Sequence, residues 1–222
     1  MKIIAALLIP ITVMCQSPDA IKLSEAIGHL IGKNLHSIGM TVDYEALVRG
    51  LKEGNEGKEA PLSEEECMLA LEAIQQEAVV QLAKKNLSAA NEFLINNGQR
   101  EGVIEIENGK LQALVIQEGS GEVVQSYHVP LVRYEGRTRE GQVFSSSLGE
   151  EAMALDSVIE GLRRGIEGMH EGEKRTLYIH PDLGFGAEDP SMPNALLIFD
   201  VEVIRADASS DEMQASSEQI VG

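Results

Sequence analysis

The side chains that usually carry covalent or metal-assisted catalysis are sparse in this sequence and form no recognisable site. The five histidines and two cysteines are scattered, without the spacing typical of zinc ligands. They are His29, His36, His128, His170, His180, Cys15 and Cys67. The serine run at 145–147 lacks the Gly-x-Ser-x-Gly elbow of a hydrolase nucleophile and indicates a polar turn. We therefore predict neither a metal site nor a cofactor.

Aromatic side chains are few and unevenly distributed. The 222 residues include four Phe, four Tyr and no Trp. Tyr44 and Phe93 stand alone in the first half, whereas all the others lie between Tyr127 and Phe199. If the chain has an aromatic-lined site, that site belongs to the second half.

The charge balance limits the kinds of partner. The 36 acidic residues outnumber the 18 basic ones and give a net charge of −18. Phosphate binding needs clustered Lys and Arg, so this balance argues against a nucleic-acid partner. It also disfavours electrostatic binding to anionic lipid. The 43% content of apolar residues excludes a wholly disordered chain.

The N-terminus, MKIIAALLIPITVMC, predicts export. Its apolar run from Ile3 to Met14 is shorter than the roughly 20 residues that span a bilayer, and its length is typical of a secretory signal. We favour a signal peptide over residues 1–14 rather than a buried N-terminal strand. Cys15 resembles the acylated cysteine of bacterial lipoproteins, although Met14 replaces the usual small residue before it. We expect a periplasmic or outer-membrane protein that contacts the membrane only through a lipid anchor at Cys15.

Helical patterns dominate residues 19–98. Apolar residues recur at three- and four-residue steps from Leu23 to Leu35, and Asp43 predicts the N-cap of a second helix. Ser63 and Glu66 form a capping box, so the acidic cluster there indicates a helix start rather than catalytic carboxylates. This helix is predicted to run to Asn97. Its apolar stripe is poor after Leu82, which is typical of a spacer between domains.

Strand patterns follow, over residues 103–205. Alternating apolar segments such as Leu177–Ile179 are separated by glycine-rich turns, which predicts an antiparallel sheet. A short helix is predicted near 157–165. The polar ending, residues 206–222, is predicted to be a disordered tail.

The second half resembles the FKBP-type peptidyl-prolyl isomerases from Leu111 to Ile204. The motifs Tyr-x-Gly, Gly-x-x-Phe, Val-Ile-x-Gly, Gly-Met-x-x-Gly-Glu and Leu-Ile-Phe-Asp-Val occur in the family's order. The first half, with AIGHLIGKNLHSIGMTVDYEALVRGLKEG and PLSEEECMLALEAIQQE, is similar to the dimerising domain of macrophage infectivity potentiator proteins. The segments LYIHPDL and LLIF of the second half most resemble the chlamydial branch of that family.

This resemblance implies an α+β fold. An antiparallel half-barrel sheet of five to six strands wraps on one short helix and forms the isomerase domain, residues 103–205. An all-α dimerisation domain, residues 19–61, precedes it, and a long connecting helix over 62–98 joins the two.

The resemblance also implies the site residues. The positions matched to catalytic groups are Tyr134, Phe144, Ile159, Phe185 and Phe199, with the backbone N–H of Ile159 as a donor to the substrate. The positions matched to substrate contacts are Ser145, Met153, Val158, Leu162 and Met192.

Several of these positions depart from the family pattern. Ser145 stands where the family usually has Asp, and Met153 where it has Phe. Leu162 replaces an aromatic pocket floor, often Trp, and Phe185 replaces a Tyr whose hydroxyl holds a substrate carbonyl. A hydrogen bond lost in the transition state costs about 0.5–1.5 kcal/mol, so these changes predict reduced activity.

Two functions are consistent with these residues. The first is an exported isomerase that assists the folding of envelope proteins, binds X-Pro segments and forms a homodimer through its N-terminal helices. Macrolide ligands of the family are implied as weak further partners. The second is a binding-only chaperone or surface interaction protein with a degenerate isomerase pocket. A purely structural lipoprotein would leave the order of the pocket motifs unexplained.

Overall fold

The computed structural model describes residues 18–37 and 42–208. The chain divides into two compact units, Met1–Ala78 and Val79–Gly222. The predicted signal peptide, Cys15 and residues 209–222 of the predicted tail lie outside the described residues. None of the helices in the described ranges is both long and apolar enough to cross a bilayer.

The N-terminal unit is helical. It contains α1 (Pro18–Ser37), α2 (Tyr44–Asn55) and the beginning of α3 (Glu64–Asn97). The Asp43 carboxylate caps α2 by accepting the N–H groups of Glu45 and Ala46, as predicted. Ser63 and Glu66 form the predicted capping box at the start of α3, with Oγ accepting the Glu66 N–H and Oε2 accepting the Ser63 N–H.

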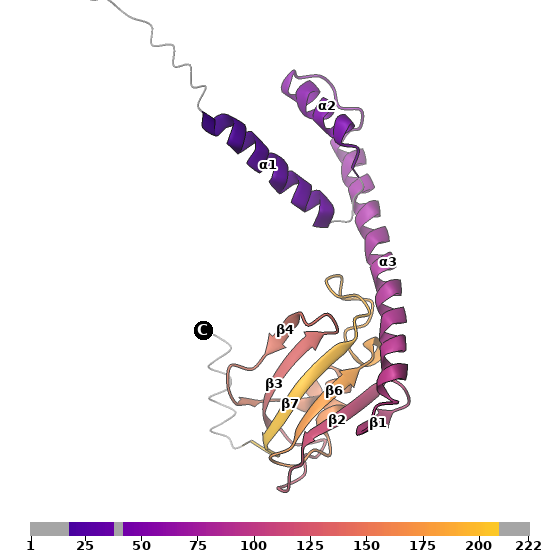
Figure 1. Ribbon diagram of the computed structural model, residues 1–222, viewed down its shortest axis with the longest axis vertical. Helices are drawn as coiled ribbons and strands as arrows, with labels where there is room; N and C mark the ends of the chain where they lie inside the picture. The colour runs from indigo at the N-terminus through magenta and orange to yellow at the C-terminus, as the bar shows by residue number, and fades with distance from the viewer. Residues whose placement is uncertain (1–17, 38–41, 209–222) are drawn as a thin grey trace, which may run out of the picture. The chain divides into compact units, whose positions relative to one another are not determined.

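The C-terminal unit is built on one antiparallel sheet. Its strands are β1 (Val103–Glu107), β2 (Leu111–Gln117), β3 (Leu131–Thr138), β4 (Val143–Ser146), β5 (Glu151–Ala152), β6 (Lys174–Ile179) and β7 (Leu197–Arg205). The seven strands follow the order β1-β2-β6-β7-β3-β4, with β5 paired to β3 (Figure 1). The sheet has more strands than the five to six expected, and the predicted α+β fold class is confirmed.

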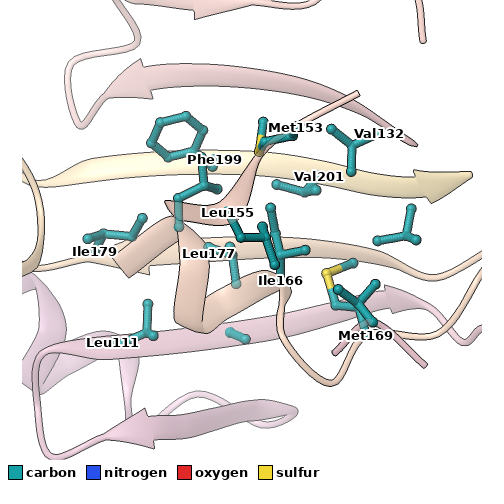
Figure 2. Close-up of a cluster of buried hydrophobic side chains, with 14 of the residues drawn as sticks. Leu111, Val132, Met153, Leu155, Ile166, Met169, Leu177, Ile179, Phe199 and Val201 are labelled. Atoms are coloured by element: carbon teal, nitrogen blue, oxygen red, sulfur yellow. The ribbon is translucent and has the colours of Figure 1, made fainter. Parts of the chain in front are cut away.

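Helix α4 (Glu160–Ile166) lies against one face of this sheet (Figure 2). A β-carbon added at Gly161 would lie 2.3 Å from Cγ2 of Ile179, and one at Gly165 would lie 2.4 Å from Cδ1 of Leu177. These glycines therefore permit the close approach of α4 to β6. The hydrophobic core between α4 and the sheet is formed by buried side chains that include Leu111, Val132, Leu155, Ile166, Met169, Leu177, Ile179, Phe199 and Val201.

The predicted short helix over 157–165 is wrong at its start. Residues Leu155–Ser157 form a 3₁₀ turn, η1, and α4 begins only at Glu160. Val158 and Ile159 between them have extended backbones, with ψ angles of 167° and 148°. The extended pair separates the two helical segments.

The second half of α3 is not a free spacer. Ala90 and Leu94 are buried, and the Phe93 ring lies 5.6 Å from that of Tyr178 on β6. These residues form a second apolar cluster with Leu196 and Ile198. Tyr178 and Ile198 alternate along β6 and β7 with the residues that face α4, so α3 covers the opposite face of the sheet. The C-terminal unit thus begins within α3, before residue 103.

The asparagines of α3 explain why the sequence pattern was misleading. Asn86 Nδ2 donates to the carbonyl of Pro193 over 2.9 Å, and Asn97 Nδ2 donates to Gln112 Oε1 over 2.9 Å. Asn91 Oδ1 lies 3.2 Å from Nε2 of His180. Residues that resembled a polar surface therefore bond to the sheet and its loops.

His180 is a buried partner in this contact, with 5% of its surface exposed. Burial lowers its pKa, and nearby Lys110 adds to this effect, whereas the Asp182 carboxylate opposes it. Nδ1 accepts the N–H of Asp182, which leaves Nε2 to donate to Asn91. The bond accepted by Nδ1 requires the neutral ring, in agreement with the lowered pKa.

The predicted tail boundary at residue 206 is also wrong. Ala206 is fully buried, and its N–H donates to Glu171 Oε1 over 2.9 Å. The Ala208 N–H donates to the Val129 carbonyl, and the Val129 N–H donates to the Asp207 carboxylate. These contacts hold the chain in the domain as far as residue 208.

Candidate functional site

An apolar pocket of about 440 Å³ opens between the sheet, α4 and the loop that precedes β7. Its lining residues are Tyr134, Phe144, Ser145, Met153, Ser157, Val158, Ile159, Leu162, Phe185, Asp189, Met192 and Phe199. Every residue predicted for the site lies in this set. Ser157 and Asp189 are additions that the sequence analysis missed.

Four aromatic rings form the walls of the pocket. The Phe144 ring contacts Phe199 and Phe185 edge to face, with centroids 5.6 Å and 5.9 Å apart. The Tyr134 ring lies 6.4 Å from that of Phe199. Phe199 is 3% exposed at the base of the group, whereas Phe185 is 40% exposed at its edge. The aromatic walls therefore extend from the solvent-exposed rim of the pocket to the buried core of the domain.

The remaining apolar lining comes from α4 and the segment before it. Leu162 on α4 and Met153 after β5 are buried, and Val158 and Ile159 are half-buried between η1 and α4. Because Ile159 precedes the first turn of α4, its N–H forms no helical hydrogen bond. In the described part of the chain this N–H has no acceptor, so it is available to a bound carbonyl.

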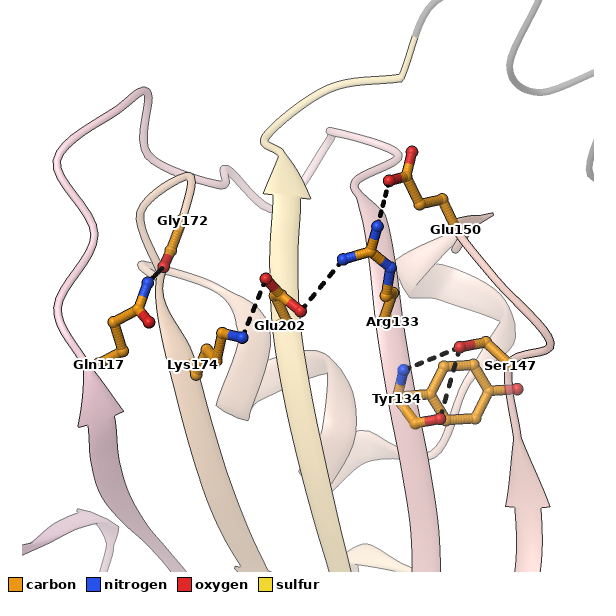
Figure 3. Close-up of polar contacts among 8 residues, drawn as sticks. All are labelled: Gln117, Arg133, Tyr134, Ser147, Glu150, Gly172, Lys174 and Glu202. Carbon is orange, nitrogen blue, oxygen red and sulfur yellow. Dashed lines mark hydrogen bonds and ion pairs between the residues drawn. The ribbon is translucent and has the colours of Figure 1, made fainter.

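The serine hydroxyls in and beside the pocket form hydrogen bonds with Tyr134 on β3. Ser145 Oγ lies 3.4 Å from the Tyr134 hydroxyl, which is a long hydrogen bond. The neighbouring Ser147 hydroxyl accepts the backbone N–H of Tyr134 over 3.0 Å and thereby joins β3 to the segment after β4 (Figure 3). The interpretation of the serine run as a polar turn is wrong for Ser145 and Ser146, which lie on β4 and pair with β3; only Ser147 follows the strand.

Asp189 is the carboxylate that lines the pocket. Hydrogen bonds from the Ser191 hydroxyl and N–H, and a weaker one from the Met192 N–H, lower its pKa. The carboxylate is therefore ionised at neutral pH. Because it already accepts hydrogen bonds from its own loop, it is a poor proton acceptor. The sequence signal for it was turn chemistry, since Asp side chains often bond to the backbone two residues on.

A larger groove of about 690 Å³ lies elsewhere on the C-terminal unit, lined by α3, β1, β2 and His180. Its buried polar side chains already have partners within the protein: Gln112 accepts a hydrogen bond from Asn97 and donates one to the Leu94 carbonyl. The apolar pocket is the better candidate because its aromatic walls present few competing polar groups.

Gly136 determines how closely the walls can approach the sheet. It lies on β3 directly opposite Phe199 in the register of β3 and β7. A β-carbon at this position would lie 2.7 Å from Phe199 Cε1 and 3.0 Å from Phe144 Cζ. These separations are well inside the ordinary carbon–carbon contact of about 3.5–4.0 Å. The glycine of the Tyr-x-Gly motif is thus the surface against which the two rings pack.

We predict that Gly136→Ala displaces both rings and destabilises the domain. Overpacking of this kind costs about 1–3 kcal/mol of unfolding free energy. Urea unfolding measures the stability change, and the aromatic NMR resonances of Phe144 and Phe199 report the displacement. Gly149→Ala is the matched control, because no atom lies within 4 Å of its added β-carbon. Unchanged stability and unchanged ring resonances in Gly136→Ala would contradict this account of the pocket.

Comparisons with known proteins agree with the fold. Residues 120–204 match the family described as FKBP-type peptidyl-prolyl cis-trans isomerase. Residues 20–113 match the domain amino terminal to FKBP-type peptidyl-prolyl isomerase.

Relatives cover most of the chain. The peptidyl-prolyl cis-trans isomerase Mip of Chlamydia muridarum is 38% identical over 192 residues, 85% of this chain and 79% of the relative. The outer membrane protein MIP of Legionella longbeachae is 28% identical, over 84% of this chain and 85% of the relative. The crystal structure of Escherichia coli FkpA shares the fold with a TM-score of 0.69 at 24% identity, and the match covers 86% of this chain and 99% of FkpA.

The residues that form the pocket, the matches to both halves and the identity to the chlamydial protein lead to the same assignment. The chain belongs to the Mip-like members of the FKBP-type peptidyl-prolyl cis-trans isomerase family.

Proposed function

We propose that the apolar pocket catalyses the cis–trans isomerisation of X-Pro bonds in exported client proteins. Amide resonance opposes rotation with a barrier of about 18–20 kcal/mol. Twisting the amide breaks this resonance and weakens the amide dipole, so an apolar, water-excluding pocket favours the twisted form over the planar one. The catalytic effect is the tighter binding of the transition state.

The chain's own residues supply what this mechanism needs. Tyr134, Phe144 and Phe199 surround the proline ring, while the Ile159 N–H donates to a substrate carbonyl and orients the peptide. No nucleophile, base or metal takes part. The observation that carries the proposal is that every residue predicted for the site lines one apolar pocket.

The activity is proposed to be lower than the family pattern would give. Phe185 has no hydroxyl for the substrate carbonyl, and Leu162 offers a smaller floor than an indole ring. Ser145 stands where the family usually has Asp, and its hydroxyl makes only a long contact of 3.4 Å with the Tyr134 hydroxyl. The same small floor predicts weak binding of the macrolide ligands of the family.

A proline-isomerisation assay on a short X-Pro peptide tests the proposal. We expect the intact chain to accelerate the reaction, Phe144→Ala to abolish most of the acceleration, and Phe185→Tyr to raise kcat/KM. The gain from a restored hydroxyl is roughly twofold to tenfold, the equivalent of one hydrogen bond.

Leu148→Ala is the control, because this side chain is 98% exposed and outside the pocket. Circular dichroism checks that each variant is folded. An intact chain no faster than Phe144→Ala would overturn the isomerase proposal and favour the second candidate, a binding-only chaperone or surface interaction protein. That candidate is motivated by the substituted positions Ser145, Leu162 and Phe185.

Export and a lipid anchor at Cys15 are the second part of the proposal. Their support is the apolar N-terminal run, together with the similarity to the outer membrane protein MIP of Legionella longbeachae. We expect labelled palmitate to be incorporated in a bacterial host and to be lost in Cys15→Ser. Equal labelling of the two proteins would contradict the anchor at Cys15.

A homodimer through the N-terminal helices is the third part. In the described residues of this unit, apolar side chains are exposed on both helices, as at Leu23 and Leu30 of α1 and Leu51 of α2. Exposed apolar residues grouped in this way mark interaction surfaces. A second copy of the chain is the partner proposed to cover them, so that two pockets act on one client.

Light scattering of the intact chain and of Leu30→Lys tests this dimer. The variant places a charge on the apolar side of α1 and should shift the chain toward a monomer. Glu25→Lys introduces the same residue about 140° around the helix and should leave the dimer intact. A monomeric intact chain, or equal behaviour of the two variants, would contradict the proposed interface.

A further inference from the structure

The loop between η2 (Pro181–Leu183) and β7 forms one side of the pocket. It carries Phe185 and Met192, so its conformation determines the shape of the pocket there. Part of its restraint is internal. The Asp189 carboxylate accepts the Ser191 N–H over 2.8 Å, and the Asn194 N–H donates to the carbonyl of Gly186 over 2.7 Å across the base of the loop.

A second restraint comes from helix α3. Asn86 Nδ2 donates to the Pro193 carbonyl over 2.9 Å, and Asn194 Nδ2 lies 3.4 Å from the Ala83 carbonyl, to which it donates. Ala83 and Asn86 are three residues apart and therefore lie on the same side of one helical turn. Two consecutive loop residues are thus held by a single turn of α3.

The backbone at the loop end suits this attachment. Asn194 has a φ angle of 53°, in the left-handed region, where Asn is one of the few residues other than glycine that are tolerated. Pro193 is buried and has its φ fixed by its ring. Met192 immediately precedes this rigid pair, so a displacement of the Pro193 carbonyl passes directly to the pocket residue.

We propose that α3 positions the pocket edge through Asn86 and Asn194, and that Asn86 is a positioning residue of the isomerase site. This rests on the proposed function. The same helix begins at Glu64 in the N-terminal unit. A change in α3 near Asn86 reaches Met192 through the Pro193 carbonyl, whereas the Tyr134, Phe144 and Phe199 rings belong to strands β3, β4 and β7. We expect this positioning to determine the affinity of the pocket for the client segment that contacts Met192.

The proposed effect is on binding rather than on the chemical step. Met192 lies on the loop side of the pocket, so we expect it to contact the client equally in the ground state and in the transition state. The twisted amide is instead stabilised by the rings on the sheet and the Ile159 N–H. Loss of such uniform binding raises KM and leaves kcat nearly unchanged. Replacing one hydrogen bond is expected to raise KM roughly twofold to tenfold.

The test uses the full chain with ¹³C-methyl-labelled methionine. Asn86→Ala removes the side-chain amide, and Asn86→Asp keeps the shape but removes the donor. Asn96→Ala is the matched control, an exposed asparagine on the same helix. The Met192 resonance is assigned by its absence from Met192→Leu. Met169 in the core and Met153 in the pocket serve as internal references.

We expect the Met192 resonance to shift or broaden in both Asn86 variants, with Met153 and Met169 unchanged and with KM raised. An unchanged Met192 resonance, or equal shifts of all three methionines, would overturn the positioning role. A Met192 shift in a chain that shows no isomerase activity would support the positioning role and contradict only the proposed function.

Discussion

Strands β6 and β7 are covered on both faces, and the rest of the C-terminal unit depends on this constraint. Leu177, Ile179 and Phe199 pack toward α4, while Tyr178 and Ile198 pack toward α3. A strand covered on both sides has its register fixed, because a slip by one residue would exchange the two sets. The fixed register places Phe199 opposite Gly136, and this pairing positions the aromatic walls.

The pocket follows from the way each face is covered. On one face, the glycines of α4 let the helix approach β6, which brings Leu162 and the extended Val158–Ile159 pair under the aromatic rings. On the other face, α3 holds the loop that carries Met192. The site therefore consists of a rigid wall formed by the sheet and α4, and a second wall attached to the helix that leads to the N-terminal unit.

The positions that the family resemblance implied all line one pocket, although they are far apart in the chain. Gly136, Phe144 and Phe199 belong to different motifs, yet each is needed where the rings meet. Local signals were also sufficient for the caps at Asp43 and Ser63, where side chains bond to neighbouring backbone.

The errors arose where long-range contacts decide the outcome. Asn86, Asn91 and Asn97 gave α3 a polar pattern, although each bonds across to the sheet or its loops. No periodicity can distinguish an asparagine that faces water from one that faces a carbonyl. The bonds of Asp189 to Ser191 and Met192 are local, but only the fold places their loop beside the pocket.

The account's central claim is that rotation about the X-Pro bond is accelerated by an apolar pocket without proton transfer. The most direct test is the solvent isotope effect on kcat/KM for a short X-Pro peptide, measured in H₂O and D₂O. We expect a ratio near unity, because no proton moves in the transition state. A large normal isotope effect would show that a proton is transferred in the transition state and would contradict the mechanism.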